Sequence, residues 1–569
     1  MKKSDFPWLK FYDAGVIPDA FCDAESLCEI FDNSVRNYAE RTAVSFSGIK
    51  MSYARLGQLV DAMAAGLQEH GLRPGDRVAL MMPNLPQMII SLFAVLKAGG
   101  VFVMINPMYM ERELSFLIND SEAEMLIALD AFWPKINAAR SELPVKKYFI
   151  TSISDYLPFP KNYLYKFKNR AEIRKYNLVY DNQSVFRWSE LMQGRQTPDK
   201  VEITPDTLAA LQYTGGTTGE AKGVMLSHYN FCVNVYQLIN FLTPSVAKQR
   251  HVFPAVLPYF HVYGLMVAMF APIALGAKIV PFPRFAPHEL LKCMSEEQAT
   301  IFGGSPAMFM ALLKTKEIKV CDLSSLTACI CGSAPIPVEH LKQFKEITGM
   351  GICEGYGLTE ASPITHLNPM HGLQKTGSIG VPLPGTEAKI VDMDLGSVEV
   401  PTNKAGELII RAPQVMQGYW RRPDDNANTL RNGWLYTGDI ATMDDDGYFY
   451  IVDRKKDMAI VGGYNVYPRE IDEVLHEHPK IKDAVSVGIP HPSKGEIIKA
   501  FIVPEDNVTL TKAEVLTYCR ERLAQFKVPR QVEFRKELPR TIVGKVLRRE
   551  LRAEEIEKQK RGAPVETDD

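Results

Sequence analysis

A stretch rich in glycine and threonine, Tyr213–Val224, is the first candidate for chemistry, because its residue types suit a phosphate group. It reads Y-T-G-G-T-T-G-E-A-K-G-V, with four glycines, three threonines and one lysine. Glycine lets backbone N–H groups converge on an anion, a threonine hydroxyl can donate a further hydrogen bond, and Lys222 would add positive charge. A Walker A loop is excluded, because Ala221 and Gly223 flank the lysine where that motif requires other residues. Taken alone, the stretch also fits a simple turn.

Alternating helical and strand patterns surround this loop and must position it. The apolar run Leu208–Leu211 immediately upstream predicts the end of a strand. Such β/α alternation predicts mostly parallel sheets covered by helices. Helices are expected over Leu27–Tyr38, Leu56–Leu67 and Gln87–Ala98, from about Asn230, and from Leu265. Strands are expected over Ala43–Phe46, Arg77–Met82, Gly100–Ile105, Val252–Leu257 and Lys278–Val280.

The pattern changes in the last third of the chain. From Gly385 to Tyr450, short alternating runs separated by turn residues predict a small β-rich subdomain. A charged run, Asp453–Asp457, comes next, and a compact stretch with its own strand and helix patterns continues to about residue 555. The charged end from Glu554 onward is expected to fray. We therefore place a domain boundary at residues 453–457.

The overall composition limits the class of protein. A chain of 569 residues should form at least two domains, and 46% hydrophobic with 23% charged residues is typical of globular proteins. The formal net charge of −2 gives no electrostatic argument for nucleic acid as a partner. The nine cysteines match neither a disulfide framework nor a zinc-ligand pattern, which favours a reducing, cytoplasmic setting.

No stretch of the sequence predicts a signal peptide or a membrane span. Residues 1–10 are positively charged but lack an apolar region. The apolar window Val262–Ala277 is short for a span and contains Gly264, Pro272 and Gly276. We expect a buried helix followed by a turn there.

A basic and aromatic stretch, Asp155–Tyr176, allows two interpretations. Its lysines and arginines interleave with tyrosines and phenylalanines, a composition that suits contact with an anionic membrane surface. The alternative is a solvated helix and loop whose aromatic side chains pack inward. We expect the second arrangement.

Seven further motifs follow the glycine-rich loop and, with it, carry a family resemblance. They are Pro258–Gly264, Gly332–Pro335, Gly355–Glu360, Tyr436–Asp439, Asp453–Asp457, Gly462–Pro468 and Pro539–Lys545. In type and order the set resembles the adenylate-forming enzymes, which include acyl- and aryl-CoA synthetases, luciferases and the adenylation domains of peptide synthetases. The resemblance extends from about residue 25 to 550. The block Asn432–Lys456 is also similar to a segment typical of fatty acyl-CoA synthetases, among which the bacterial long-chain fatty-acid–CoA ligases are the most similar group.

This resemblance implies an α/β fold with two domains. The N-terminal domain, residues 1–453, would hold two stacked α/β sheet subdomains and a small β-rich subdomain. A mobile α+β C-terminal domain, residues 458–569, would swing about a hinge at residues 454–457, centred on Lys456. The swing would bring Gly462 and Gly463 to the CoA channel, where glycine lets a ligand pass close to the backbone.

The reaction implied by the resemblance activates a carboxylate in two steps. The carboxylate attacks the α-phosphate of ATP to give acyl-AMP and pyrophosphate, and the thiol of CoA then displaces AMP. Because the first step brings two anions together, the site needs cations and hydrogen-bond donors where charge develops. ATP, Mg²⁺ and CoA as co-substrate are therefore the expected cofactors.

The resemblance also assigns roles to single residues. Thr359 would bond the α-phosphate, Glu360 would ligate Mg²⁺, and Lys545 would bridge the substrate carboxylate and the α-phosphate. His261 would border the acyl carboxylate and the CoA thiol. The β- and γ-phosphates of ATP would contact Thr214, Gly215, Gly216, Thr217, Thr218, Gly219 and Lys222. The AMP part would contact Gly332, Ser333, Ala334, Gly355, Tyr356, Gly357, Asp439 and Arg454.

The acyl chain is expected beside Tyr263, Gly303, Gly304 and Gly357. Short-chain relatives carry tryptophan at the position of Gly357, so glycine there favours a medium- or long-chain fatty acid. Aryl-CoA ligases also carry a small residue, which keeps an aryl acid as the alternative substrate.

Other classes of protein stay in view beside the CoA ligase. An acyl-AMP ligase that loads a carrier protein would share most of the motifs. A P-loop phosphotransferase conflicts with the loop spacing, and a non-catalytic membrane protein would give Glu360 and Lys545 no role. A homodimer and peripheral contact with the inner face of the cell membrane are left open as partners.

Overall fold

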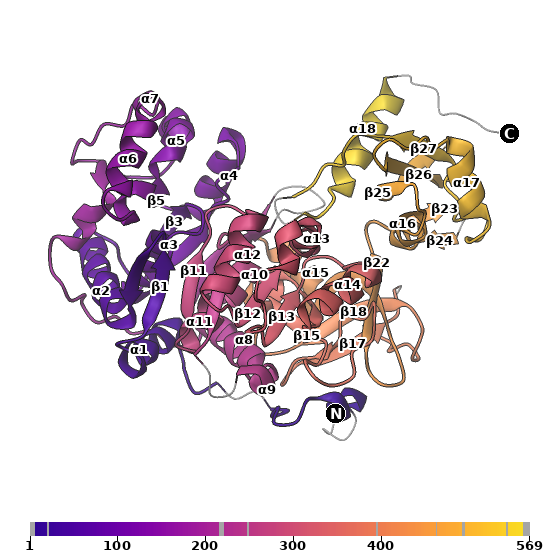
Figure 1. Cartoon of the computed structure of the whole chain (residues 1–569), viewed down its shortest axis with the longest axis horizontal. Coiled ribbons are helices and arrows are strands. Elements are labelled where there is room, and N and C mark those ends of the chain that lie inside the picture. The colour runs from indigo at the N-terminus through magenta and orange to yellow at the C-terminus, as the bar shows by residue number, and fades with distance from the viewer. Residues whose placement is uncertain are drawn as a thin grey trace. The chain divides into compact units, whose positions relative to one another are not determined.

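The structure, a computed structural model, describes residues 6–19, 22–214, 221–246, 250–393, 396–461, 464–491, 495–541 and 544–561. The chain divides into two compact units, whose elements are labelled in Figure 1. The larger unit comprises Trp8–Glu387 and Arg411–Gly433. The smaller unit comprises Met1–Pro7, Ala388–Ile410 and Trp434–Asp569.

An eight-stranded sheet forms the first layer of the larger unit, in the order β19-β9-β8-β4-β3-β5-β6-β7. The strands from β8 to β7 run parallel, and β9 pairs antiparallel with β8. The strands are β3 (Arg77–Met81), β4 (Val101–Met104), β5 (Met125–Leu129), β6 (Lys147–Thr151), β7 (Val185–Arg187), β8 (Leu208–Thr214), β9 (Lys222–Ser227) and β19 (Gly418–Tyr419). The predicted parallel α/β arrangement is confirmed.

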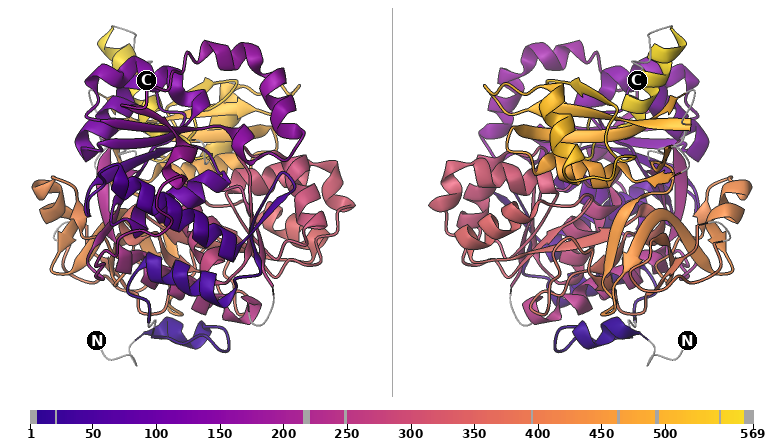
Figure 2. Two further views of the ribbon diagram at one scale, coloured as in Figure 1. Left: turned by 90° about the vertical axis from the view of Figure 1, so that its left-hand side faces the viewer. Right: turned by 90° about the vertical axis from the view of Figure 1, so that its right-hand side faces the viewer.

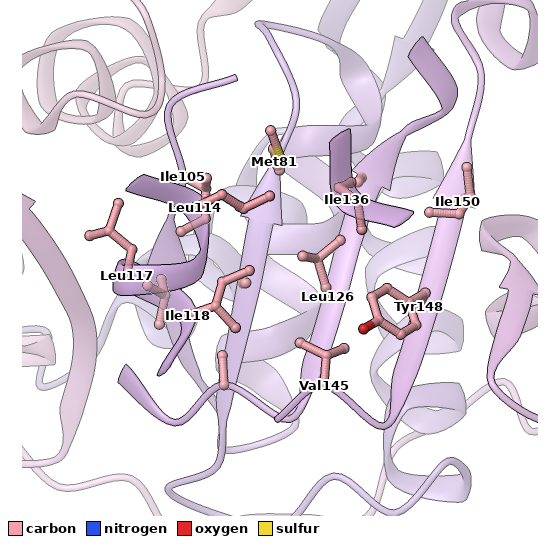
Figure 3. Packing of buried hydrophobic residues seen from close by; sticks show 14 of the residues in the cluster. Met81, Ile105, Leu114, Leu117, Ile118, Leu126, Ile136, Val145, Tyr148 and Ile150 are labelled. Atoms are coloured by element: carbon pink, nitrogen blue, oxygen red, sulfur yellow. The ribbon is translucent and has the colours of Figure 1, made fainter. Parts of the chain in front are cut away.

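Helices α3 (Pro86–Lys97), α4 (Glu111–Ser121) and α5 (Trp133–Ala139) connect parallel strands of this sheet. The same unit contains α1 (Leu27–Asn37) and α2 (Tyr53–Glu69), which precede and follow the first two strands of the chain, and α8 (His228–Phe241), which follows β9. On α4, Leu114, Leu117 and Ile118 recur at helical spacing and are all buried against the sheet. Figure 3 shows these side chains in one cluster with Leu126 of β5 and Tyr148 of β6. Each buried apolar side chain of this kind stabilises the fold by about 1.5–3 kcal/mol.

Two further sheets form the rest of the larger unit, in the orders β10-β11-β1-β2 and β12-β13-β14-β15-β16. The first contains β1 (Thr42–Phe46), β2 (Ile49–Ser52), β10 (Val252–Ala255) and β11 (Lys278–Pro281). The second contains β12 (Ile301–Gly304), β13 (Ala328–Cys331), β14 (Ile352–Gly357), β15 (Ile364–Leu367) and β16 (Val381–Pro382). Helices α12 (Pro287–Glu296), α13 (Pro306–Lys314) and α14 (Val338–Thr348) alternate with these strands.

Strand β1 pairs with a partner that the order of elements in the sequence does not suggest. It lies parallel to β11, with Val44 opposite Ile279, rather than beside β3. The hydroxyl of Tyr53 donates a 2.7 Å hydrogen bond to the carbonyl of Ala277 and reinforces this junction. The first two strands of the chain therefore share a sheet with two strands from a segment about two hundred residues later.

The apolar window after residue 262 is helical and buried. It consists of α10 (Val262–Leu265), a π-helical turn (Met266–Phe270) and α11 (Ala271–Ala274). The π-helical turn ends two residues before Pro272, which has no N–H to donate to the helix. The prediction of a buried helix is confirmed, although the helix begins at Val262. Within the described residues, no helix is long and apolar enough to cross a membrane.

The basic and aromatic stretch forms two short helices, α6 (Lys161–Lys168) and α7 (Arg170–Lys175). The expectation that its aromatic side chains pack inward is wrong for Phe159, Tyr163 and Phe167, which are 81%, 66% and 78% exposed. Helix periodicity turns the rings of Tyr163 and Phe167 outward, whereas Tyr165 of the same helix is partly buried, and Phe159 lies just before the helix begins.

The smaller unit begins with the predicted β-rich part. Strands β17 (Glu387–Val391), β18 (Gly406–Arg411), β21 (Trp434–Met443) and β22 (Phe449–Arg454) form an antiparallel arrangement in which β21 pairs with both β18 and β22. A second sheet follows in the order β24-β23-β26-β25, with β27 beside β26. Its strands are β23 (Ala459–Val461), β24 (Tyr464–Val466), β25 (Ile481–His491), β26 (Gly495–Pro504) and β27 (Gln531–Phe534). Helices α16 (Pro468–His476), α17 (Lys512–Arg520) and α18 (Arg548–Lys560) complete it; Figure 2 gives two further views of the chain.

The expected fraying from Glu554 onward is wrong for the described residues. Helix α18 continues to Lys560, and Glu555 is 5% exposed. Its Oε2 accepts a 2.7 Å bond from Nζ of Lys499, a β26 side chain that is 8% exposed. A charged residue is buried only when it is paired, so this contact fixes a helix that its composition alone predicts to be loose.

Candidate active site

The β8–β9 hairpin positions the two ends of the glycine-rich loop. Thr214 ends β8 and lies opposite Lys222, which begins β9. One position further from the loop, Tyr213 faces Gly223, where an added Cβ would lie 3.1 Å from the tyrosine ring. Five predicted phosphate contacts lie outside the described residues: Gly215, Gly216, Thr217, Thr218 and Gly219.

Tyr419 connects the predicted phosphate lysine to the predicted metal ligand. Its hydroxyl donates a 2.8 Å hydrogen bond to Oε1 of Glu360, and Nζ of Lys222 lies 5.1 Å from its ring centroid. The lysine also forms an ion pair with Asp425 at the start of α15 (Pro423–Thr429). Burial and the Glu360 charge raise the pKa of the Tyr419 hydroxyl, which therefore stays protonated and able to donate.

Sequence reasoning missed Tyr419 and Asp425. Tyr419 is placed by β19, which pairs antiparallel with β9 so that Tyr419 lies opposite Val224. Asn426 fixes the same backbone, since it accepts from the N–H of Tyr419 at 2.6 Å and donates to its carbonyl at 3.0 Å. These residues lie about two hundred positions beyond Lys222 in the chain, so no local pattern could have linked them to the loop.

Thr359 and Glu360 lie on a short 3₁₀-helix, Thr359–Ala361, that follows β14. The N–H of Met416 donates a 2.8 Å bond to the Glu360 carbonyl and ties this turn to the segment that leads to Tyr419. Ser362 ends the turn in a left-handed conformation, and its hydroxyl donates to the carbonyl of Gln414. The orientation of the Glu360 carboxylate is thus fixed from both its backbone and its side chain.

Two predicted nucleotide-contacting glycines on β14 are required by the packing of the backbone. An added Cβ at Gly357 would lie 2.1 Å from the Pro363 carbonyl oxygen, and one at Gly355 would lie 2.8 Å from the side chain of Leu367. Between them, the ring of Tyr356 meets that of His366 edge-on, with centroids 6.0 Å apart. Burial lowers the pKa of His366 to about 3, so its imidazole is neutral beside Tyr356.

Tyr263 joins the ends of two strands that carry predicted site residues. Its hydroxyl lies 3.3 Å from the carbonyl of Gly304 on β12 and 3.2 Å from that of Ile330 on β13. An added Cβ at Gly332 would lie 3.3 Å from its ring, and one at Gly303 would lie 2.5 Å from Val267. Beyond Gly332, Ser333 has a left-handed backbone conformation, and both Ser333 and Ala334 are exposed. Tyr263 therefore lies against Gly304 of the predicted acyl pocket and Gly332 of the predicted adenine contacts.

His261 precedes α10 and is held through its neighbours. Its backbone N–H donates a 3.0 Å hydrogen bond to the Pro258 carbonyl. The side chain of Gln212 on β8 donates a 2.9 Å hydrogen bond to the carbonyl of Phe260. Buried Asn84, which sequence reasoning also missed, accepts from the N–H of Tyr259 and donates to the Ala255 and Leu257 carbonyls. The strand that leads into the glycine-rich loop is thus hydrogen-bonded to the segment that carries His261.

In the smaller unit, Asp439 and Arg454 lie opposite each other on β21 and β22. Nε of Arg454 lies 2.9 Å from Oδ1 of Asp439, whose side chain is only 3% exposed. Lys455 pairs with Glu407 at 2.9 Å, while the next residue, Lys456, is exposed in the turn that follows. Gly462 and Gly463, the predicted contacts to CoA, lie outside the described residues.

The charges of Arg454 and Asp439 act on the pKa of Lys545. Arg454 is the main cause of a lowered pKa, which falls to about 8 for the Lys545 amine, while Asp439 acts in the opposite direction. Desolvation of the amine lowers the pKa of Lys545 further, as a smaller cause than the Arg454 charge. The structure thus brings Asp439, Arg454 and Lys545 together within the smaller unit.

Comparison with known proteins identifies the family to which this chain is similar. A family model described as AMP-binding enzyme matches residues 31–420, and one described as AMP-binding enzyme C-terminal domain matches residues 470–545. The chain is 42% identical over 562 residues to a long-chain-fatty-acid–CoA ligase of Bacillus subtilis (strain 168), covering 98% of this chain and 99% of that protein. It is 41% identical over 556 residues to a protein of the same name from Escherichia coli O6:H1, covering 96% and 98%.

A solved structure shares the fold. The crystal structure of ATP-bound MatB from Rhodopseudomonas palustris matches with a TM-score of 0.81 at 28% identity, covering 93% of this chain and 98% of that one. The first family model alone spans well over half of the chain and includes Lys222, Glu360 and Tyr419. The chain belongs to the AMP-binding, adenylate-forming enzymes.

Proposed function

We propose that the protein is a long-chain fatty-acid–CoA ligase that uses ATP and proceeds through an acyl-AMP intermediate. Identity above 40% to two ligases of that name, over nearly the whole chain, supports the substrate class. The observation that carries the chemistry is the chain of contacts from Lys222 through Tyr419 to Glu360. Lys222, a cation suited to phosphate, and Glu360, a carboxylate suited to a hard metal ion, contact the same tyrosine, which supports nucleotide activation as the chemistry of this site.

For the leaving group, we propose that Thr214 and Lys222 contact the β- and γ-phosphates together with the intervening loop. Lys222 is paired with Asp425, and both side chains are partly exposed. Exposed ion pairs of this kind contribute only about 0–1 kcal/mol. A phosphate chain can therefore replace the Asp425 carboxylate as the partner of Lys222 at little cost.

The residues present fit a magnesium ion that arrives with ATP. Among the described residues, no group of three His, Cys, Asp or Glu side chains is placed to hold a metal ion. Mg²⁺ commonly keeps one or two protein carboxylates and completes its shell with phosphate oxygens and water. Glu360 would be that protein carboxylate. The bound ion would supply positive charge that offsets the phosphate charge when the substrate carboxylate approaches.

For the adenylation step, we propose that Lys545 holds the acyl carboxylate and the α-phosphate while Thr359 donates to the latter. Tyr356, with Gly332, Ser333 and Ala334, would border adenine, and Asp439 with Arg454 the ribose. A protonated lysine draws the two anions together, so the lowered pKa of Lys545 limits this step to pH values at which the amine keeps its proton.

For thioester formation, we propose that residues 458–569 reorient about the turn at residues 454–457, with Lys456 at its centre. Gly462 and Gly463 would then border the CoA channel, and His261 the reacting thiol and acyl carbonyl. The interval between the two family matches, residues 421–469, contains this turn, which supports a domain boundary there.

The acyl pocket is proposed beside Tyr263, Gly303 and Gly304. The Tyr263 hydroxyl is held by two strand carbonyls, so a gating movement of its ring would have to break both hydrogen bonds. Gly357 has a backbone reason to lack a side chain, as its approach to Pro363 shows. A bulky substitution at Gly357 would therefore change the strand turn as well as the pocket, and Gly303 is the cleaner position to test.

The deciding experiment measures pyrophosphate release across fatty acids of increasing length, with cinnamate and benzoate as aryl acids, with and without CoA. Fastest turnover on long fatty acids, with AMP release that needs CoA, is the expected result. Preference for cinnamate or benzoate would favour an aryl-CoA ligase. Acyl-AMP that accumulates and is not consumed by CoA would favour a ligase that loads a carrier protein. Sedimentation would decide whether the enzyme is a homodimer.

A further inference from the structure

The segment around α6 presents a cluster of large apolar side chains to solvent. Phe159, Tyr163, Leu164 and Phe167 are 81%, 66%, 60% and 78% exposed. Neither α6 nor α7 contains a buried residue. Water contact with this much apolar surface is unfavourable, and contiguous apolar patches on a protein surface commonly mark a contact site. Isolated exposed side chains would need no such explanation, whereas four within one short segment do.

The apolar side chains of α6 share one face. At about 100° per residue, Tyr163, Leu164 and Phe167 lie within one outward arc of the helix. The ring of Phe159 extends this face, since it meets Tyr163 edge-on with centroids 6.0 Å apart. On the opposite side, Tyr165 is partly buried and near Asp130, which raises the pKa of its hydroxyl together with the larger effect of burial. The outward face is therefore a fixed feature of how α6 packs on the larger unit, which is seen where α5, α6 and α7 gather in Figure 1.

Basic side chains border this apolar face. By the same helical spacing, Lys161 and Lys168 lie on one side of it and Lys166 on the other. The segment 159–176 carries six basic residues against one acidic residue, Glu172, which gives a net charge of +5 in a chain whose formal net charge is −2. None of the ion pairs formed by the described residues engages the six, which are Lys161, Lys166, Lys168, Arg170, Arg174 and Lys175. The positive charge of this surface is therefore available to an anionic partner.

We propose that this surface, α6 and α7 with Phe159, docks on an anionic lipid bilayer. The four apolar side chains would enter the boundary between headgroups and acyl chains, and the six basic side chains would contact headgroup phosphates. An apolar face bordered by lysine and carrying aromatic rings has the composition of helices that lie in that boundary.

The size of the surface favours a bilayer over a second copy of the chain. An eight-residue helix is only about 12 Å long, whereas a stable protein interface buries about 800 Å² on each partner. A net charge of +5 on the same segment of both copies would also repel. A lipid bilayer needs neither a matching shape nor a large rigid area. This inference rests on the surface alone and is independent of the substrate proposed above.

The test is flotation of the full-length protein with vesicles of phosphatidylglycerol and phosphatidylcholine, or of phosphatidylcholine alone. Binding is expected only to the anionic vesicles and should weaken with salt, because screening shortens the reach of the basic side chains. The triple variant Tyr163→Ser, Leu164→Ser, Phe167→Ser should lose at least about tenfold in the bound fraction. Lys161→Glu, Lys166→Glu, Lys168→Glu should lose a similar amount.

Matched variants elsewhere separate this surface from general charge. Lys314→Glu, Lys316→Glu, Lys319→Glu changes the net charge equally on another exposed segment, and Val320→Ser removes an apolar side chain that is 82% exposed. Both should bind anionic vesicles as the parent protein does. Equal binding by the α6 variants, no binding by the parent, or a dimer that the α6 variants dissociate without any vesicle contact would each overturn the proposal. Pyrophosphate release, measured on the same samples without vesicles, shows whether each variant is folded and active. It therefore tests the proposed function independently of membrane binding.

Discussion

The hydroxyl of Tyr419 lies 2.8 Å from Oε1 of Glu360 and donates its proton to that carboxylate. This bond joins a residue of the segment Gly418–Tyr419 to the 3₁₀-helix that bears the proposed magnesium ligand. Glu360 would then offer its other oxygen, Oε2, to the proposed magnesium ion from an orientation that this bond fixes. The relationship gives a direct test of whether Glu360 needs to be oriented in order to act.

Tyr419→Phe should slow adenylation and raise the Mg²⁺ concentration needed for half-maximal rate. A hydrogen bond to a charged group contributes about 1.5–3 kcal/mol, which corresponds to a loss of about 10- to 100-fold. Pyrophosphate–ATP exchange over a Mg²⁺ titration measures both effects. Tyr12→Phe, which removes a 2.7 Å hydroxyl bond to the Pro382 carbonyl elsewhere in the same unit, is the control and should change neither. An unchanged Mg²⁺ requirement in Tyr419→Phe would remove Tyr419 from the site.

Asp425→Asn should lower the KM for ATP by up to about fivefold, because it removes the carboxylate that competes with phosphate for Lys222. Lys222→Ala should raise the KM for ATP at least about tenfold, because it removes the charge itself. Initial rates at varied ATP concentration distinguish the two directions. If both variants raised the KM, Asp425 would be a supporting residue rather than a competitor.

The rate of adenylation should fall as pH rises through about 8. Arg454 lowers the pKa of Lys545 from its ordinary value to about 8, and only the protonated amine can hold two anions. The alkaline limb should appear in kcat/KM, which reports ionisations of the unliganded enzyme. Lys545→Arg should be slower but should lose this limb, since guanidinium stays protonated throughout. A limb that persisted unchanged in Lys545→Arg would assign the ionisation to another group.

Lys456→Pro should abolish thioester formation while sparing acyl-AMP formation. Proline fixes its own φ and restricts the preceding residue, so the turn could not reorient. The turn is closed by bonds from the N–H groups of Asp457 and Met458 to the carbonyl of Arg454, at 3.0 and 3.1 Å. Separate assays of pyrophosphate release and of thioester product measure the two half-reactions. Lys456→Ala, which keeps φ adjustable, should retain both, and equal losses in Lys456→Pro would place the pivot elsewhere.

Gly303→Leu should shift the preference from palmitate toward shorter acids by at least about tenfold in kcat/KM. An added Cβ there would lie 2.5 Å from Cγ1 of Val267, so the Val267 side chain would have to shift and the space proposed for the acyl chain would shrink. Differences of a few methylene groups in a pocket commonly change binding by one or more kcal/mol each. Gly351→Leu is the matched control, because its nearest neighbour is a glutamine side-chain oxygen at 3.9 Å. Unchanged chain-length preference in Gly303→Leu would exclude it from the pocket.

Local patterns predicted most elements of the fold, because hydrophobic periodicity is a property of neighbouring residues. The helix over Leu56–Leu67 and the strand over Arg77–Met82 are found within a few residues of their expected bounds. The pairing of β1 with β11 was not predictable, since nothing near Val44 specifies Ile279. The packing of α18 through the Lys499–Glu555 ion pair was not predictable for the same reason, because the two residues are far apart in the sequence.

The residues of the candidate site likewise fall into those that the sequence predicted and those that it did not. The motifs supplied Lys222, Glu360, Asp439 and Lys545, because each stands in a recognisable run of residues. Tyr419, Asp425 and Asn84 stand in no such run. They matter through hydrogen bonds or ion pairs with residues far along the chain, and these appear only once the sheets are assembled.

The parallel pairing of β1 with β11 also sets an order of events during synthesis. The hairpin of β1 and β2 is synthesised more than two hundred residues before β11. Until β11 is made, the edge of β1 that pairs with it has no strand partner. Unpaired strand edges are prone to join other chains, and pairings between distant segments form slowly. The interval before β11 emerges is therefore when the nascent chain most needs a chaperone, and a fragment that ends before Lys278 would keep that edge exposed permanently.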